Sequence, residues 1–153
     1  AHALIGDPKL IIVDEPTTGL DPEERIRFRN LLTRVSDKDV VIVLSTHIVG
    51  DISSTCTDMA LMNKGILSYK GSPEHLIELA KQNVWKITAT ETEYFEIQEK
   101  YPIISSIPSE EGWEVQVVSK EINGYLGERI EPNLEHAYVN FMENELNQKW
   151  IEI

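Results

Sequence analysis

The sequence has one cysteine and no long apolar run. Cys56 has no partner for an internal disulfide, and so low a cysteine content is typical of a reducing compartment. No apolar stretch approaches the roughly 20 residues that a membrane-spanning helix needs, and no secretory signal is visible. Hydrophobic residues make up 41% of the 153, enough for one ordinary domain or two small ones.

Basic residues are also scarce, above all in the second half. Residues 1–82 hold 9 Lys and Arg and 12 Asp and Glu, a net charge of −3. Residues 83–153 hold 5 and 14, a net charge of −9, and all 14 acids there are glutamate. This change in composition predicts a domain boundary near Gln82 and Asn83. It also argues against a nucleic-acid partner, because the second segment would repel phosphates.

A short apolar run near the start ends in two carboxylates. Residues 10–13 are Leu, Ile, Ile and Val, and Asp14 and Glu15 follow them. With Pro8 before it and Pro16 after it, this run predicts a strand buried on both faces, as in a parallel sheet. Ligands of open α/β sheets bind beyond the carboxyl ends of such strands, where these two acids would lie. An acidic pair after a strand is also typical of a solvated loop start.

A helix and a second strand follow. Asp21 is a favourable N-cap and Pro22 a favourable first residue for the helix. Its core stripe consists of Phe28, Leu31, Leu32 and Val35. Residues 40–44 then form a second apolar strand, which ends just before His47. Strand, helix and strand in this order predict a βαβ unit, whose parallel strands end at one edge of the sheet. We therefore expect His47 to lie beside the acidic pair.

The segment Asp14-Glu15-Pro16-Thr17-Thr18-Gly19-Leu20-Asp21-Pro22 closely resembles the Walker B motif and D-loop of ATP-binding cassette (ABC) ATPases, and His47 matches their H-loop histidine. The resemblance implies that Asp14 binds Mg²⁺ and that Glu15 is the general base for the attacking water. It implies that His47 donates a hydrogen bond to the γ-phosphate of ATP. Asp21 would contact a second ATP-binding subunit across a head-to-tail dimer; helix capping is a simpler role, and the two are compatible. These four residues form the predicted nucleotide site.

The next elements continue this resemblance. The pattern predicts a short helix over residues 48–55, a β-hairpin over residues 59–69 and a helix over residues 73–82, with Ser72 as its N-cap. The hairpin and the last helix resemble the region after the H-loop of ABC ATPases. We therefore place residues 1–82 in the C-terminal part of an ABC-type ATPase domain, with the parallel sheet and helices of a P-loop NTPase.

The remaining residues, 83–153, predict a small accessory α+β domain. Strands are expected over residues 84–90, 103–107 and 113–119, and helices over residues 92–100 and 132–142. Thr92 is the expected N-cap of the first helix. The expected inward face of the second helix consists of Leu134, Ala137, Tyr138 and Phe141. The pattern Pro-x-Leu-Glu-x-Ala-Tyr in this helix resembles the terminal helix of many ABC ATPase subunits that carry a small extra domain.

The phosphate-binding loop of an ATPase is absent from the chain. A P-loop needs Gly-x-x-x-x-Gly-Lys followed by Ser or Thr, and the sequence has neither a Gly-Lys dipeptide nor a Leu-Ser-Gly-Gly signature. ABC ATPases carry both before Walker B. We therefore expect this chain to be a truncated portion of a longer ATPase subunit and to be inactive alone.

The expected whole is the ATP-hydrolysing subunit of an ABC transporter. The resemblance implies a cytoplasmic protein at the inner face of the membrane, bound to a transmembrane permease and paired with a second ATP-binding subunit as a homo- or heterodimer. One alternative is a non-transport ABC ATPase that acts on ribosomes or chromosomes. Ribosomal members usually carry Asn-His in place of Thr18-Gly19, which favours transport. The other alternative is a regulatory or binding module in residues 83–153.

Overall fold

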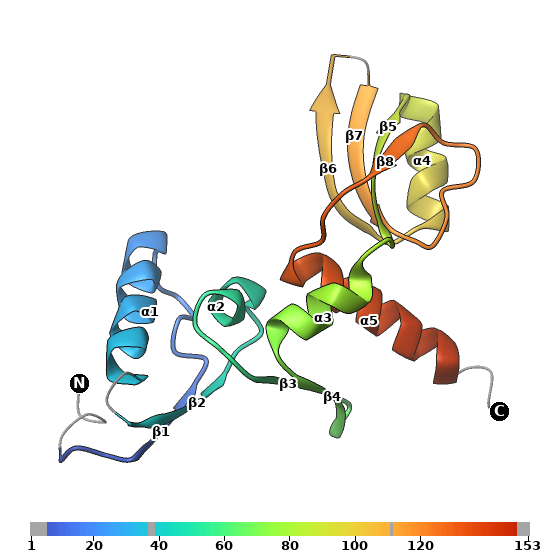
Figure 1. The fold of residues 1–153 in the computed structure, drawn as a ribbon. Coiled ribbons are helices and arrows are strands. Elements are labelled where there is room, and N and C mark those ends of the chain that lie inside the picture. The colour runs from blue at the N-terminus through green and yellow to red at the C-terminus, as the bar shows by residue number, and fades with distance from the viewer. Residues whose placement is uncertain (1–5, 37–38, 111, 150–153) are drawn as a thin grey trace. The chain divides into compact units, whose positions relative to one another are not determined.

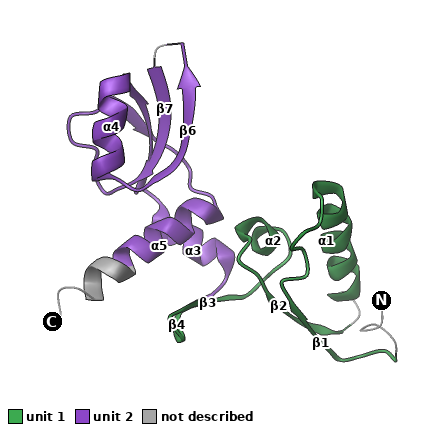
Figure 2. Cartoon of the chain, turned by 180° about the vertical axis from the view of Figure 1, so that it is seen from behind, with its two compact units in different colours: residues 1–70 green, residues 71–153 purple. Residues whose placement is uncertain are grey.

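The computed structural model describes residues 6–36, 39–110 and 112–149, with side chains through residue 144. The chain forms two compact units, residues 1–70 and 71–153 (Figure 2). Helices and strands occur in both (Figure 1), which confirms the mixed α/β class. In the part of the chain described, no helix combines the length and apolar character that a membrane crossing requires.

The first unit is built on a βαβ motif. Its elements are β1 (Leu10–Asp14), α1 (Pro22–Ser36), β2 (Val41–Ser45), α2 (Val49–Ser53), β3 (Met59–Asn63) and β4 (Ile66–Gly71). β1 and β2 are parallel, and Asp14 is the register partner of Ser45. This pairing confirms that both strands end at one edge. β3 and β4 form the predicted hairpin, whose turn at Lys64 and Gly65 has positive φ angles at both residues, as a tight two-residue loop requires.

The β1–β2 pair is buried on one face only, so the prediction of strands buried on both faces is wrong for this chain. Ile11 is 5% exposed, whereas its neighbour Ile12 is 70% exposed and Val41 63%. Successive side chains of a strand point to opposite faces, and the unit packs only one face of this two-stranded sheet. An apolar run shows that a strand can be buried on both faces. Burial of the second face also requires another layer of structure to cover it.

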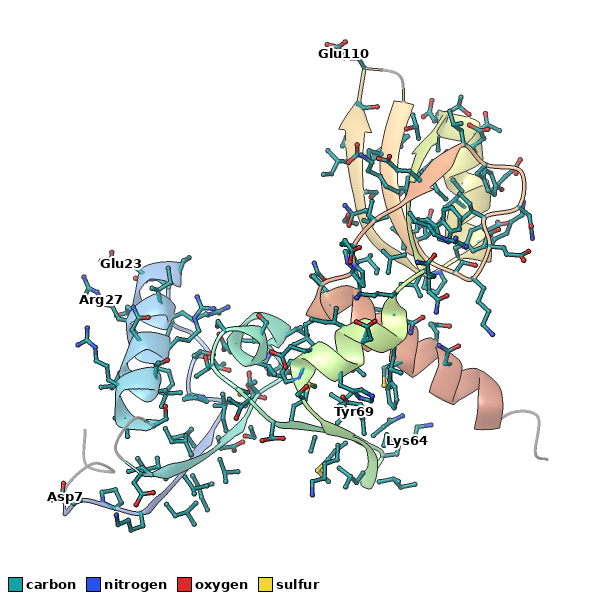
Figure 3. All side chains as sticks on the ribbon, in the orientation of Figure 1. Asp7, Glu23, Arg27, Lys64, Tyr69 and Glu110 are labelled. Atoms are coloured by element: carbon teal, nitrogen blue, oxygen red, sulfur yellow. The ribbon has the colours of Figure 1, made fainter. Side chains whose placement is uncertain are left out.

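The second unit contains a four-stranded antiparallel sheet. Its elements are α3 (Pro73–Ala80), β5 (Val84–Ala89), α4 (Glu91–Lys100), β6 (Ile103–Ser109), β7 (Gly112–Val118), β8 (Gly127–Arg129) and α5 (Leu134–Lys149). The strand order is β6-β7-β5-β8. Between the sheet and α4 lies a core that includes Ile87, Ile97, Val115 and Val117, each fully buried. Glu110 lies just beyond the end of β6 (Figure 3).

Helix α4 begins at Glu91 with Thr90 as its N-cap, so the assignment of the cap to Thr92 is wrong. The Thr90 hydroxyl accepts the backbone N–H of Glu93 at 3.3 Å, and the Glu93 carboxylate accepts the N–H of Thr90 at 2.8 Å. This reciprocal capping box decides between the two threonines, because only Thr90 has a glutamate three residues later. The backbone hydrogen bond from Thr90 lowers the pKa of Glu93.

Helices α3 and α5 pack against each other within the second unit. Leu76 and Ala80 of α3 and Ala137 of α5 are fully buried. The Asn140 amide of α5 donates to the Leu79 carbonyl at 3.4 Å. The structural division after residue 70 therefore comes earlier in the chain than the boundary predicted at residues 82 and 83, because packing keeps α3 with α5. Assignment of residues 1–82 to an ATPase domain and of residues 83–153 to an accessory domain stays a prediction.

Asn133 caps the N-terminus of α5, and the buried His136 returns a hydrogen bond to it. The Asn133 side chain accepts the N–H of His136 at 2.9 Å, and His136 Nδ1 accepts the N–H of Asn133 at 3.1 Å. His136 Nε2 lies 2.9 Å from the Gln116 amide oxygen of β7. Burial lowers the pKa of His136, and the Glu135 charge opposes this shift. His136 is 5% exposed, whereas Tyr138 is 38% exposed, so the prediction that Tyr138 faces inward is wrong.

We expect the free energy of unfolding of the second unit to fall as the pH drops below 6.5, the ordinary pKa of histidine. The folded pKa of His136 is the lower one, so the unfolded chain binds the proton first. Stability is complete above 6.5 and is lost as the pH falls toward the folded pKa. Glu93 acts in the same direction, but below its ordinary value of 4.5. The measurement is urea unfolding across about pH 5 to 8.

The matched variant is His136→Gln, because glutamine keeps a hydrogen-bond acceptor at the third helical position and removes the titration. Its stability is expected to vary less with pH over the same interval. An equal slope for the variant and the parent chain would contradict the assignment of this pH dependence to His136.

Candidate functional site

The carboxyl edge of β1 and β2 brings polar groups from both strands together. Asp14 and Ser45 are register partners, and the Ser45 hydroxyl donates to Asp14 Oδ1. One residue further on, the Glu15 N–H donates to the Ser45 carbonyl at 2.9 Å. The two strands therefore stay paired up to the residue that follows Asp14. This pairing gives the acidic pair a defined backbone.

Glu15 and His47 meet at this edge. His47 Nδ1 lies 2.8 Å from Glu15 Oε2, and the His47 side chain is 73% exposed and that of Glu15 37%. Glu15 has a φ of +44°, in the left-handed region that non-glycine residues seldom adopt. The chain turns sharply there, directly after Asp14. The predicted meeting of His47 with the acidic pair is confirmed.

Asp21 caps α1. Its Oδ1 accepts the N–H of Glu24 at 2.8 Å, and its carbonyl accepts the N–H of Arg25 at 3.0 Å. No hydrogen bond or ion pair joins Asp21 to Asp14, Glu15 or His47 in the described residues. The structure thus brings together three of the four predicted site residues and gives the fourth the capping role that the sequence also predicted.

The arginines of α1 have two different environments. Arg27 forms an exposed ion pair with Glu23 at 2.5 Å, one helical turn away (Figure 3). Arg29 instead contacts α2, where it donates to the Gly50 carbonyl at 3.1 Å and to the Ser54 hydroxyl at 3.2 Å. Arg27 therefore lies on a solvated face of α1, whereas Arg29 is part of the packing between two helices.

A buried polar pair behind the site was not found from the sequence. Thr17 and Asp51 are each 1% exposed, and the Thr17 hydroxyl donates to Asp51 Oδ2. The sequence offers a weak indication only: Asp51 lies four residues after His47, between the apolar Ile48 and Ile52. Ser45 was also missed, although a strand register aligned at the two carboxyl ends would have paired it with Asp14.

The side chains at this edge fit Mg²⁺ only if phosphate and water provide most of its ligands. Among the residues with a described placement, no three His, Cys, Asp or Glu side chains gather as a protein-only metal site needs. Mg²⁺ is usually held by one or two carboxylates together with substrate phosphates and water. The Asp14 carboxylate, exposed at the strand end, is a group of this kind. The site can offer Mg²⁺ one carboxylate and leave its other positions to phosphate and water.

The arrangement can both accept a proton and donate hydrogen bonds. Glu15 provides a carboxylate that can take a proton from a water, the usual task of a general base. When the His47 imidazole carries two protons, Nδ1–H donates to Glu15 and Nε2–H is free to donate to an anionic oxygen. Together with the Asp14 carboxylate, these groups suit hydrolysis at a charged phosphate.

Sequence comparisons lead to one class of protein. No family model matches the chain. An uncharacterized ABC transporter ATP-binding protein of Bacillus subtilis, YxlF, is 31% identical over 107 residues, which are 70% of this chain and 36% of that protein. Another from a Nostoc species, all4389, is 36% identical over 87 residues, 57% of this chain and 25% of that protein. The human retinal-specific phospholipid-transporting ATPase ABCA4 is 38% identical over 76 residues, 50% of this chain and 3% of that protein.

A solved structure of an ABC transporter in an inward-facing conformation aligns with 72% of this chain and 40% of its own, at 20% identity and a TM-score of 0.42. The chain spans about a third or less of the length of the relatives named above. Over the part that it matches, the chain is a homologue of the ATP-binding proteins of ABC transporters.

Proposed function

We propose that this chain supplies one edge of the ATP-hydrolysis site in the ATP-binding subunit of an ABC transporter. The observation that carries the proposal is the contact of Glu15 with His47, next to Asp14, at the carboxyl edge of two parallel strands. The names of the relatives support an ATP-binding role for the subunit. Hydrolysis is the function that these three side chains suit best.

Each residue has a task that its position allows. Glu15 orients and deprotonates the attacking water, since its carboxylate is accessible and extends from the end of β1. His47 donates a hydrogen bond to the γ-phosphate as negative charge develops there. Asp14 would hold Mg²⁺, and its hydrogen bond from Ser45 keeps the carboxylate oriented. When bound, Mg²⁺ would neutralise part of the charge on the phosphates.

Partners and location follow from the same proposal. The subunit would bind a transmembrane permease at the inner, cytoplasmic face of the membrane and would pair with a second ATP-binding subunit. Relatives named as ABC transporter proteins support both partners in general terms. Asp21, at the start of α1, would face the second subunit in addition to capping the helix.

The test of the proposal is ATP turnover by the full-length subunit. We expect Mg²⁺-dependent release of phosphate. Absence of turnover in a folded subunit assembled with its permease would overturn the proposal. The residue-specific form of this test is the Glu15→Gln variant of the same subunit.

The 153-residue chain alone is expected not to bind Mg-ATP at sub-millimolar concentration. The sequence contains no P-loop, so no nest of backbone N–H groups and no P-loop lysine are available for the phosphates. Its carboxylates and net charge of −12 oppose a nucleotide that is itself anionic. The measurement is calorimetric titration with Mg-ATP. A saturable heat with a micromolar dissociation constant would place a phosphate site somewhere in this chain and contradict the prediction.

A further inference from the structure

The base in the proposed reaction is held in a strained turn. Glu15 has a φ of +44°, and its carbonyl accepts the N–H of Thr18 at 3.2 Å. The next bond of the turn joins the Leu20 N–H to the Thr17 carbonyl at 3.1 Å. A non-glycine residue stays in the left-handed region only when its surroundings hold it there. The Glu15 side chain is more than a third exposed, so burial of that side chain alone does not explain its conformation.

Thr17 anchors this turn to α2. Its hydroxyl donates to Asp51 Oδ2, and both residues are 1% exposed. Asp51 lies in α2, which begins at Val49 shortly after His47, so the bond ties the turn that carries Glu15 to this helix. A hydrogen bond between two side chains so well buried is costly to remove, because it leaves a polar group unpaired.

A third element holds Asp51 in place. Arg29 Nη1 of α1 lies 3.9 Å from Asp51 Oδ1 and donates to the Gly50 carbonyl and the Ser54 hydroxyl, both in or next to α2. Asp51 Oδ1 has no hydrogen-bond partner among the described residues, so the nearby Arg29 charge offsets part of the cost of burying this carboxylate. The three segments that carry Glu15, His47 and Asp21 thus converge on Asp51.

We propose that Asp51 is a positioning residue for the reaction: its buried carboxylate holds Thr17, and through Thr17 it keeps Glu15 in contact with His47. This inference rests on the proposed function for its catalytic consequence. The positioning itself is a property of this chain without nucleotide. The two parts can therefore be tested separately.

The first test reads the His47 tautomer by long-range ¹H–¹⁵N correlation spectra of the 153-residue chain at alkaline pH, where histidine imidazoles are neutral. The nitrogen that carries the proton depends on the hydrogen bond it makes. Because Nδ1 faces the Glu15 carboxylate, we expect the proton on Nδ1 in the parent chain. Thr17→Val keeps the shape and removes the hydroxyl, and is expected to shift the proton toward Nε2. Thr17→Ser keeps the hydroxyl and is expected to retain the parent tautomer.

These outcomes decide whether the bond between Thr17 and Asp51 keeps Glu15 in contact with His47. A folded Thr17→Val chain with an unchanged His47 tautomer would overturn it, and so would an equal shift in Thr17→Ser. If Thr17→Val does not fold, Thr17→Ala takes its place, because it also removes the hydroxyl that donates to Asp51. An unchanged His47 tautomer in folded Thr17→Ala would again overturn the proposal.

The second test measures hydrolysis by the full-length subunit. Thr17→Val is expected to lower kcat about 10- to 100-fold with little change in KM, because misplacing a catalytic group by about 1 Å can cost 10²-fold. Thr17→Ser should restore most of the rate. Parent-like kcat in Thr17→Val, when Glu15→Gln is impaired, would contradict positioning by Asp51. Equal rates for the parent and Glu15→Gln would instead show that the proposed function has failed.

Discussion

Glu15→Gln in the full-length subunit is expected to lower the rate of ATP hydrolysis by about 10²- to 10⁴-fold, the usual loss for a positioned general base. The glutamine amide keeps the size of the side chain, and its oxygen can still accept a hydrogen bond from His47 Nδ1. It cannot accept a proton from water at neutral pH. ATP binding should therefore persist, because the variant leaves the metal ligand Asp14 and the hydrogen bond from Ser45 unchanged.

The measurement is steady-state phosphate release together with nucleotide binding by the same preparation. The matched control is Glu23→Gln on α1, which also replaces a glutamate by its amide. Glu23 is 74% exposed and, among the described residues, pairs with Arg27 alone, on its own helix, so its loss should leave the rate unchanged. Parent-like turnover in Glu15→Gln would refute the role of Glu15, and an equal loss in Glu23→Gln would show that the effect is not specific to the site.

The candidate site could be predicted because its geometry follows from two local patterns. Each strand is a short apolar run with polar residues directly after it, and a helix between two such runs makes the strands parallel. Their carboxyl ends must then share an edge, so Glu15 and His47 meet although 31 residues lie between them. No property of either residue beyond its place after a strand was needed.

The buried hydrogen bond between Thr17 and Asp51 could not be predicted in the same way. Asp51 and Thr17 are polar residues in a short helix and a turn, and no periodic pattern marks either as buried. Their burial results from the packing of α2 against the turn, with Arg29 of α1 providing the opposing charge. Tertiary contacts among three segments determine this pairing, and local sequence patterns do not predict such contacts.

The domain division shows a similar limit of local patterns. The net charge of the sequence does change near Asn83. This change reflects the residues on the surface and not the packing of the core. Packing follows apolar side chains, and Leu76 and Ala80 of α3 are fully buried in the unit that includes α5. The sequence predicted the helix itself and its N-cap at Ser72, which accepts the N–H of His75 at 3.2 Å. Helix formation is a local property, whereas the partner of the helix is not.

Ile97→Ala is expected to lower the free energy of unfolding of the second unit by about 2–5 kcal/mol. Ile97 on α4 is fully buried in the core with Ile87, Val115 and Val117. Alanine is a good helix former, so the helix itself should tolerate the change, and the loss reflects the missing side-chain volume. A small domain has about 5–15 kcal/mol of stability in total, so this single change removes a large share of it.

Thermal unfolding followed by near-ultraviolet circular dichroism measures this loss, because the stacked rings of Tyr94 and Trp113, 4.5 Å apart, report on the same core. A loss of this size should lower the Tm by about 10 °C or more, since 1 kcal/mol corresponds to about 4–8 °C in a domain of 60–100 residues. The matched control is Phe95→Ala on the same helix. Phe95 is 59% exposed, so its removal should change stability by about 0.5 kcal/mol or less. Equal shifts in Tm for the two variants would mean that α4 does not pack on the sheet through Ile97.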